Sequence, residues 1–394
     1  MNTSSSSAQQ LPATLTQFEA NYKELQQLAL NLDLTRGKPS NDQLSLSEPL
    51  DSILNQQFSL DGIDLRNYGN LDGLPSTKAL FASLADVDAQ SIIIGGNASL
   101  TLMYQTVMMA HFFGLADQKA WSKQGITPTF ICPTPGYDRH YSICEHLGIN
   151  MVTVDMTETG PNMDQVEKLI ATNETIRGLW CVPRFSNPTG VVYSSETVDR
   201  IAQLGKNAHP SFRIFYDNAY CVHHLNRSAP KLGAIAPKLQ AYATEDSLIH
   251  FGSTSKITFA SAGVSFLASS PANIASIKSH LSNITIGPDK INQAKHVLFL
   301  KNKETVLNHM DKHAAILKPK FDCVLSKLTA AFGDNDDATW TVPEGGYFVS
   351  VDVKPGLAKR IIALAAEAGV KLTPAGATFP YGNDPKNANI RIAP

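Results

Sequence analysis

A lysine, an aspartate and an asparagine lie in three short motifs whose residue types suit chemistry on an aldehyde cofactor. The motifs are Asn-Pro-Thr-Gly at 187–190, Asp-x-x-Tyr at 217–220 and Ser-x-x-Lys at 253–256. A lysine on a turn of small residues can approach an aldehyde closely and form a Schiff base, provided that its amine is partly deprotonated. Pyridoxal phosphate uses such a lysine and also needs an acid to keep its ring nitrogen protonated. Lys256 and Asp217 are therefore the candidate catalytic residues.

The surroundings of the aspartate support this interpretation. Asp217 follows the apolar run at 212–216, so the carboxyl end of a strand would present it. Asn187 and Tyr220 are candidates to hydrogen-bond the oxygen of the cofactor ring. No single motif is specific, but the ordered set of three strongly indicates a pyridoxal phosphate site.

The elements that must position these residues follow from an alternation of short β-branched or aromatic runs with segments of helical period. This alternation predicts a mostly parallel sheet covered by helices on both faces, a three-layer α/β/α domain. Ligands of such sheets bind at the carboxyl ends of the strands, where Asn187, Asp217 and Lys256 fall. The seven expected strands are 92–94, 129–132, 151–154, 178–182, 212–216, 248–251 and 264–268.

The cofactor phosphate is expected at the small residues that follow the first of these strands and open a helix over 100–113. Backbone N–H groups at a helix N-terminus can contact a phosphate, and the helix dipole favours the anion. Alone, this segment would be an ordinary helix start, but the lysine and aspartate downstream favour a phosphate site. The expected phosphate ligands are Gly96, Asn97, Ala98 and Ser99, with hydroxyl groups from Ser253 and Ser255.

The motifs resemble those of the fold-type I aminotransferases, which are relatives of aspartate aminotransferase. Two further stretches, 34–40 and 372–382, are similar to the bacterial type Ic aspartate aminotransferases, and the resemblance runs from about residue 32 to 394. It implies a pyridoxal phosphate enzyme that moves an amino group from an L-amino acid, foremost aspartate or glutamate, to a 2-oxo acid such as 2-oxoglutarate. It also implies a large cofactor-binding domain with the seven-stranded sheet and a small α+β domain.

The resemblance assigns further roles. Tyr137 matches the aromatic residue that stacks on the pyridine ring, although a tyrosine in such a loop can also simply pack on the surface. Arg391 matches the residue that binds the α-carboxylate of the substrate together with Asn187, because a guanidinium can hold a carboxylate with two parallel hydrogen bonds. The alternative for Arg391 is a structural ion pair with an acidic residue.

The resemblance also assigns roles to residues in two other segments, one that faces the substrate and one that contacts the neighbouring subunit. The loop at 33–40 matches one that covers the substrate, so Arg36 and Gly37 are candidate substrate contacts, with a solvated loop charge as the alternative for Arg36. Tyr68 matches by its spacing a tyrosine that reaches the cofactor phosphate of the neighbouring subunit. The resemblance therefore implies a homodimer in which the partner subunit completes each active site.

The sequence departs from the family at two places. The better-known aspartate aminotransferases carry an arginine on the phosphate eight residues after the lysine, whereas this chain has Val264 there. Relatives also continue past the arginine strand with a closing helix, whereas this sequence ends at Pro394, so the small domain is expected to close differently unless the chain is shortened. The cation for the distal carboxylate of an acidic substrate stays open among Arg36, Arg139 and Arg184.

The expected domain organisation has four parts. It comprises a disordered tail at 1–13, an N-terminal arm with part of the small domain at 14–64, the large domain at 65–310 and the C-terminal small domain at 311–394. A long helix at 290–316 is expected to join the two domains, followed by a helix at 321–332.

Composition limits the other function classes. A formal net charge of −2 gives no basis for binding nucleic acid or an anionic membrane. The five scattered cysteines, the absence of a signal peptide and the lack of an apolar run of membrane-spanning length indicate a cytoplasmic protein. Histidine spacing suggests no metal site, and His140 and His146 are interpreted as structural. The rival functions are a pyridoxal phosphate β-lyase or decarboxylase and, in another class, a non-catalytic sensor module.

Overall fold

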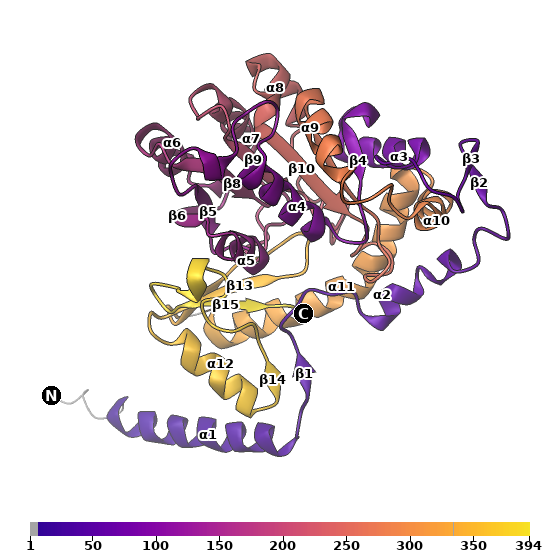
Figure 1. Ribbon diagram of the computed structural model, residues 1–394. Helices are drawn as coiled ribbons and strands as arrows, with labels where there is room; N and C mark the ends of the chain where they lie inside the picture. The colour runs from indigo at the N-terminus through magenta and orange to yellow at the C-terminus, as the bar shows by residue number, and fades with distance from the viewer. Residues whose placement is uncertain (1–6, 334) are drawn as a thin grey trace.

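The computed structural model describes residues 7–333 and 335–394, and its main feature is an eight-stranded sheet (Figure 1). The strand order is β4-β11-β10-β9-β8-β5-β6-β7. The strands from β10 to β6 are parallel, whereas β11 is antiparallel to both neighbours and β7 is antiparallel to β6. The bounds are β4 (Ile92–Ile94), β5 (Thr129–Thr134), β6 (Asn150–Thr157), β7 (Gly160–Pro161), β8 (Ile176–Cys181), β9 (Arg213–Asp217), β10 (Leu248–Ser253) and β11 (Ser265–Ser269).

All seven predicted strands are present, and the prediction of a mostly parallel sheet is confirmed. The predicted number of seven is one too low, because β7 adds an eighth strand at the edge. This strand has only two residues, Gly160 and Pro161, so it carries no alternating apolar pattern that a sequence could reveal.

Helices cover both faces of the sheet, as predicted for a three-layer domain (Figure 1). Side chains of successive strand residues point to opposite faces, so separate apolar clusters form on the two sides, one on the first face and two on the second. One face packs against α4 (Ser99–Phe112), α5 (Asp138–His146) and α9 (Pro271–Leu281). The other face carries α3 (Pro75–Ala85), α6 (Met163–Thr172), α7 (Ser195–Gln203) and α8 (Ala236–Tyr242).

The packing between β8 and β5 provides a test of the core. A Cβ atom on Gly178 would lie 2.4 Å from the ring of Phe130, which is fully buried. We expect Gly178→Ala to lower the free energy of unfolding by about 1–3 kcal/mol, because overpacking a rigid core forces the surrounding groups to shift. Urea denaturation measures this change. Gly233→Ala is the matched control, since a Cβ there meets no atom within 4 Å, and equal effects of the two substitutions would contradict the expectation.

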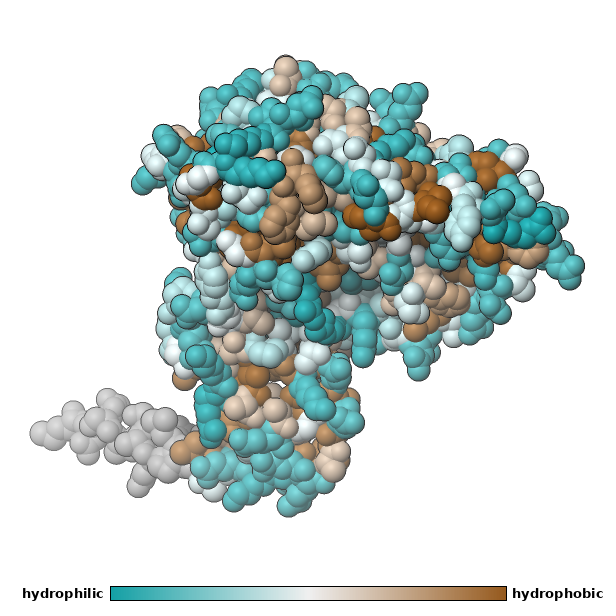
Figure 2. Space-filling view, in the orientation of Figure 1, coloured by the Kyte–Doolittle hydropathy of each residue, from teal (hydrophilic) through white to brown (hydrophobic). Residues whose placement is uncertain are grey.

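A smaller unit lies below the main sheet in Figures 1 and 2. Its three-stranded antiparallel sheet has the order β12 (Ala338–Trp340), β13 (Val349–Val353) and β15 (Asn389–Ile392), with α12 (Ala358–Glu367) beside it. A second, parallel pair joins β1 (Leu32–Asp33) to β14 (Val370–Lys371), so the N-terminal arm is attached to this unit. The division of the chain into 14–64, 65–310 and 311–394 remains a prediction.

The two long helices differ from the predicted ones. Helix α10 spans Lys290–Leu300 and α11 spans Lys303–Phe332, so the break expected after residue 316 instead lies at Lys301 and Asn302. Lys301 has φ of 55°, which leaves the helical region, and the Asn302 side chain accepts a hydrogen bond of 2.9 Å from the Thr305 N–H. This N-cap starts a new helix.

The N-terminal segment is more ordered than expected. The first six residues of the predicted disordered tail lie outside the described residues, but 7–13 belong to α1 (Ser7–Gln27). Alanine, glutamine and leucine in this stretch favour a helix, which explains its early start. The Tyr22 hydroxyl donates a 2.9 Å hydrogen bond to the Leu364 carbonyl and so attaches α1 to α12 (Figure 1).

Short elements complete the chain. They are α2 (Asn41–Ser45), β2 (Ser59–Leu60) and β3 (Ile63–Asp64), together with the 3-10 helices η1 (Glu48–Leu50), η2 (Ala89–Ser91), η3 (Trp121–Lys123), η4 (Leu204–Lys206), η5 (Glu245–Ser247) and η6 (Pro380–Gly382). Among the helices of the described residues, none is both long enough and apolar enough to cross a membrane. On the face shown in Figure 2, apolar side chains form small patches separated by polar ones.

Candidate active site

A cavity of about 180 Å³ lies at the carboxyl ends of β9 and β10 and beside the N-terminus of α4. The three sequence motifs, which are far apart along the chain, meet at this cavity because parallel strands end at the same edge of the sheet. The predicted site residues that line it are Ala98, Ser99, Tyr137, Asn187, Asp217, Tyr220, Ser253, Ser255 and Lys256.

Lys256 lies on a turn directly after β10. The turn is closed by hydrogen bonds of 2.8 Å and 2.9 Å from the N–H groups of Ile257 and Thr258 to the Thr254 carbonyl. The amine of Lys256 lies 5.5 Å from the centre of the Tyr220 ring. Desolvation lowers the pKa of Lys256, although the negative charge of Asp217 opposes this effect. A lowered pKa increases the fraction of neutral, nucleophilic amine, as covalent chemistry at a lysine requires.

Asp217 is the last residue of β9 and is almost completely buried. Its Oδ2 lies 3.0 Å from Nε2 of His140, whereas its Oδ1 has no hydrogen-bond partner among the described residues. The His140 ring is stacked on Trp180, with ring centres 4.2 Å apart and planes inclined by 7°. The Tyr137 ring contacts His140 edge-on at 4.9 Å. In Asp217, Oδ2 is therefore held by His140, whose ring is packed between Trp180 and Tyr137. Oδ1 can accept a hydrogen bond from a bound ligand.

His140 is the functional candidate that the sequence analysis missed. The sequence predicts a structural role for it, whereas in the structure it is the hydrogen-bond partner of the proposed acid, from which it is separated by 77 residues. Its position on the first turn of α5, three residues after Tyr137, was the available signal. Nothing in the local sequence indicated which carboxylate it would contact.

The residues present fit pyridoxal phosphate. A buried carboxylate oxygen without a partner is costly, and a protonated ring nitrogen in the cavity would remove that cost. Asp217 Oδ1 provides such an acceptor, and Lys256 provides an amine at the same cavity. Asn187 and Tyr220 also line the cavity, and their contact with a ring oxygen stays a prediction.

Only some of the predicted phosphate ligands line this cavity. Ala98 is the N-cap residue of α4, and the Ser255 hydroxyl donates to the Asn97 carbonyl, while the Ser253 hydroxyl donates to the Ser255 hydroxyl at 3.2 Å. Gly96 and Asn97 do not line this cavity but border a neighbouring one of about 380 Å³, whose wall includes Lys295.

Val264 also borders that neighbouring cavity, and its side chain is buried. Its backbone N–H donates a 2.9 Å hydrogen bond to the Thr254 hydroxyl, and its carbonyl accepts one of 2.9 Å from the Thr254 N–H. The position where better-known relatives place an arginine therefore supports the lysine turn through its backbone and supplies no charge.

Arg391 lies on β15 next to the cavity and is 5% exposed. Its Nη1 donates to Asn187 Oδ1 at 3.0 Å and to Asp138 Oδ1 at 3.3 Å. Its Nη2 donates to the Thr35 carbonyl at 3.2 Å and its Nε donates to the Thr373 hydroxyl at 3.2 Å. The contact with Asn187 connects the guanidinium to the cavity, while the contact with Asp138 is the ion pair of the alternative interpretation.

Besides Gly96, Asn97 and the neighbouring Arg391, three further predicted site residues do not line the cavity. Arg36 is exposed, and Gly37 packs closely on the small unit, since a Cβ there would lie 2.5 Å from Cβ of Tyr347. Tyr68 is 82% exposed, and its carbonyl accepts a 3.1 Å hydrogen bond from the amine of Lys290. The cavity of the single chain is thus formed without them.

The other two candidate cations for a distal carboxylate are engaged elsewhere. The guanidinium of Arg184 donates to the backbone carbonyls of Cys221 and, at 3.3 Å, of Pro230. Arg139 forms an ion pair of 3.9 Å with Asp138. Neither side chain lines the cavity that contains Lys256.

Comparisons with known proteins agree with this geometry. Residues 5–394 match the family described as aspartate amino-transferase. The chain is 43% identical to an aspartate aminotransferase of Corynebacterium glutamicum over 376 residues, which cover 95% of this chain and 86% of the relative. The crystal structure of an aspartate transaminase from the same species superposes with a TM-score of 0.94 at 41% identity, covering 99% of this chain and 92% of that one.

A more distant structure shares the fold. The α-aminoadipate aminotransferase of Thermus thermophilus, solved with N-(5'-phosphopyridoxyl)-L-leucine, superposes with a TM-score of 0.74 at 19% identity, covering 92% of this chain and 87% of that one. The family match and the close relatives, together with the lysine and aspartate at one cavity, lead to one conclusion: the chain belongs to the aspartate aminotransferase family and is a transaminase.

Proposed function

We propose that this transaminase uses pyridoxal phosphate bound at Lys256 to move the amino group of L-aspartate or L-glutamate to a 2-oxo acid such as 2-oxoglutarate. The observation that carries the proposal is the placement of Lys256 at the same cavity as Asp217, whose Oδ1 lacks a partner among the described residues. The acidic donor is supported by the similarity to the Corynebacterium glutamicum aspartate aminotransferase.

When bound, the cofactor supplies an aldehyde carbon for the lysine amine and a protonated pyridine ring that accepts electrons from the substrate. Lys256 is the group that would hold the cofactor and then carry a proton to and from the substrate carbon, since its amine is desolvated and has a lowered pKa. The ring of Tyr220 lies beside this amine, with its centre 5.5 Å away.

Asp217 would keep the ring nitrogen protonated through Oδ1. Because Oδ2 is fixed by His140 at 3.0 Å, and His140 is in turn stacked on Trp180, the carboxylate is oriented before the cofactor arrives. Tyr137, which lies at the cavity wall and contacts His140, is suited to stack on the ring. Preorganised groups of this kind cost no rearrangement during the reaction.

Arg391 would bind the α-carboxylate of the substrate. Its contact with Asn187 places the guanidinium at the edge of the cavity, and its bonds to Thr35 and Thr373 fix its direction. The expected division of labour is that Arg391 orients the substrate and Lys256 moves the proton.

We expect Arg391→Lys to lower kcat/KM about 10- to 100-fold, mainly through a raised KM, because a charged hydrogen bond contributes about 1.5–3 kcal/mol and lysine cannot form the bidentate contact. Steady-state kinetics with aspartate measures this effect. Arg200→Lys on α7, far from the cavity, is the control. An unchanged KM for Arg391→Lys would assign this arginine to its ion pair with Asp138 alone.

The exposed Tyr68 supports a homodimer in which the partner subunit completes the site. A tyrosine that is 82% exposed is available to a second copy of the chain. In this proposal Arg36 and Gly37 belong to the loop that covers the substrate, and Gly96, Asn97, Ala98, Ser99, Ser253 and Ser255 surround the phosphate. A cytoplasmic location is part of the same proposal.

The visible spectrum of the purified, cofactor-loaded protein tests the function. L-aspartate should bleach the yellow colour, and 2-oxoglutarate should restore it. Bleaching by L-alanine or an aromatic amino acid but not by aspartate would keep the transaminase and overturn the acidic donor. Release of ammonia or carbon dioxide instead of a recoverable amine form would favour a β-lyase or a decarboxylase. A protein that binds the cofactor without any turnover would be a sensor.

A further inference from the structure

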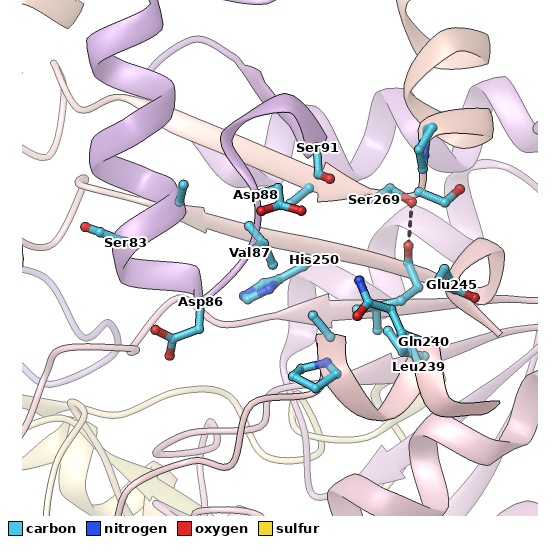
Figure 3. Close-up of a pocket in the computed structure, with 17 residues that line it drawn as sticks. Ser83, Asp86, Val87, Asp88, Ser91, Leu239, Gln240, Glu245, His250 and Ser269 are labelled. Carbon is cyan, nitrogen blue, oxygen red and sulfur yellow. Dashed lines mark hydrogen bonds between the residues drawn. The ribbon is translucent and has the colours of Figure 1, made fainter. Parts of the chain in front are cut away.

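A second cavity, of about 710 Å³, opens near the amino end of β10, between the segment of α3 and η2 on one side and the segment of α8 and η5 on the other (Figure 3). It shares no lining residue with the cavity around Lys256. It also lies at the opposite end of β10, because Leu248 begins this strand and Ser253 ends it. No step of the proposed transamination uses this space.

His250 forms the inner wall of the second cavity, and its ring is drawn between Val87 on one side and Leu239 and Gln240 on the other in Figure 3. The side chain is 97% buried, since 3% of its surface is exposed. Neither Nδ1 nor Nε2 has a hydrogen-bond partner among the described residues. A buried polar group that lacks every partner calls for an explanation, and a ligand in the cavity provides one.

The surroundings keep this imidazole uncharged at neutral pH. Its ring packs edge-on against Tyr216 at 5.4 Å and is tilted against Phe266 at 5.8 Å. Burial lowers the pKa of His250 to about 4, although the negative charges of Asp217 and Asp86 oppose the shift. A neutral imidazole has one nitrogen that accepts and one that donates a hydrogen bond.

The outer wall of the second cavity is acidic. Asp86, Asp88 and Glu245 line it, and neither a lysine nor an arginine is among its lining residues. Asp86 is paired with Lys303 at 2.9 Å, whereas the structure shows no ion pair for Asp88 or Glu245 in the part of the chain that it describes. Figure 3 shows Asp86 and Asp88 on the α3 side and Glu245 on the α8 side of the cavity. The wall therefore attracts cations.

We propose that this second cavity binds a small aliphatic cation whose ammonium group lies near Asp88 and Glu245 and whose second N–H or O–H group hydrogen-bonds His250. A metal ion does not fit, because the described residues contain no group of three or more histidine, cysteine, aspartate or glutamate side chains that could hold one. An anion such as a dicarboxylic acid is repelled by the carboxylates of Asp88 and Glu245. The proposal does not depend on the proposed amino donor.

Isothermal titration of the cofactor-loaded protein with four matched probes tests the proposal. The probes are 1,4-diaminobutane, 4-amino-1-butanol, butylamine and 1,4-butanediol. The first two should bind, butylamine should bind at least tenfold more weakly because it cannot reach His250, and the uncharged diol should show no binding. Added salt should weaken the binding of the diamine, since the carboxylates that it would contact are accessible to solvent. Equal affinity for the diamine and the diol would overturn the proposal.

Two variants locate the site. His250→Phe keeps an aromatic ring at this position, although a larger one, and removes both ring nitrogens. It should weaken the binding of 1,4-diaminobutane at least tenfold, with circular dichroism as the check of folding. The double variant Asp88→Asn, Glu245→Gln changes only the outer wall, so it tests the proposal even if the His250 variant is unstable, and it too should weaken the diamine at least tenfold. Unchanged diamine binding in either folded variant would place the ligand elsewhere and refute the assignment.

Discussion

Replacing Lys256 with alanine should abolish covalent attachment of the cofactor and lower transaminase turnover by at least about 1,000-fold, within the range that general acid–base groups supply. Lys256 lines the cavity, and the contact described for its amine is the one with the Tyr220 ring. The substitution therefore removes the reactive amine and disturbs few packing contacts. Reduction with borohydride followed by mass spectrometry measures the attachment. The wild-type chain should gain the mass of the cofactor less one water and plus the two hydrogens of the reduction, and the variant should gain nothing.

The control for Lys256→Ala is the same substitution of a lysine on the surface. Lys318→Ala on α11 removes an exposed amine that is paired with Asp322, and it should leave both the attachment and the turnover unchanged. A Lys256→Ala protein that still carries the cofactor covalently and still turns over would end the proposed role of this residue. Partial recovery of turnover by added methylamine would support the proton-transfer role.

Replacing Asp217 with asparagine should lower turnover about 10- to 100-fold or more, because a hydrogen bond to a charged group contributes about 1.5–3 kcal/mol. Asparagine keeps the shape but loses the charge that holds a proton on the ring nitrogen. The visible spectrum measures this effect independently of turnover, since loss of the ring proton shifts the absorbance of the bound cofactor. Cofactor attachment at Lys256 should persist in this variant.

His140 provides the matched comparison for Asp217. His140→Phe retains the carboxylate and the stack on Trp180 but removes the partner of Oδ2, so it should reduce turnover less than Asp217→Asn. It should also displace the pH dependence of the visible spectrum, which a merely structural role would not do. Turnover that falls further in His140→Phe than in Asp217→Asn would contradict the idea that the histidine acts by positioning the aspartate.

The sequence predicted the parts of the fold and site that depend on local patterns. The seven predicted strands have apolar runs of their own, and Asp217 and Lys256 lie where two of those runs end, so their meeting at one sheet edge followed from the parallel topology. The break between α10 and α11 was predicted some fifteen residues too late. In the sequence the only sign of this break is Asn302, a possible N-cap residue, and a single asparagine is a weak signal within a strongly helical pattern.

The contacts that escaped prediction are those between distant segments. His140 on α5 contacts Asp217 on β9. Arg391, near the C-terminus of the chain, contacts both Asn187 and Asp138. The unpartnered nitrogens of His250 are also invisible in the sequence, since an alternating strand position gives its face but not its neighbours. Burial and pairing of polar side chains depend on the assembled tertiary structure, which motif spacing does not determine.

The stack of Trp180 on His140 gives the protein a built-in optical reporter. The indole of Trp180 lies 4.2 Å from the imidazole of His140, which is hydrogen-bonded to Asp217, so the emission of Trp180 depends on the position of that imidazole. Trp121 and Trp340 have no such neighbour among the ring contacts of the described residues. A displacement of His140 next to Asp217 can therefore be followed by tryptophan fluorescence, without a label and before any turnover occurs.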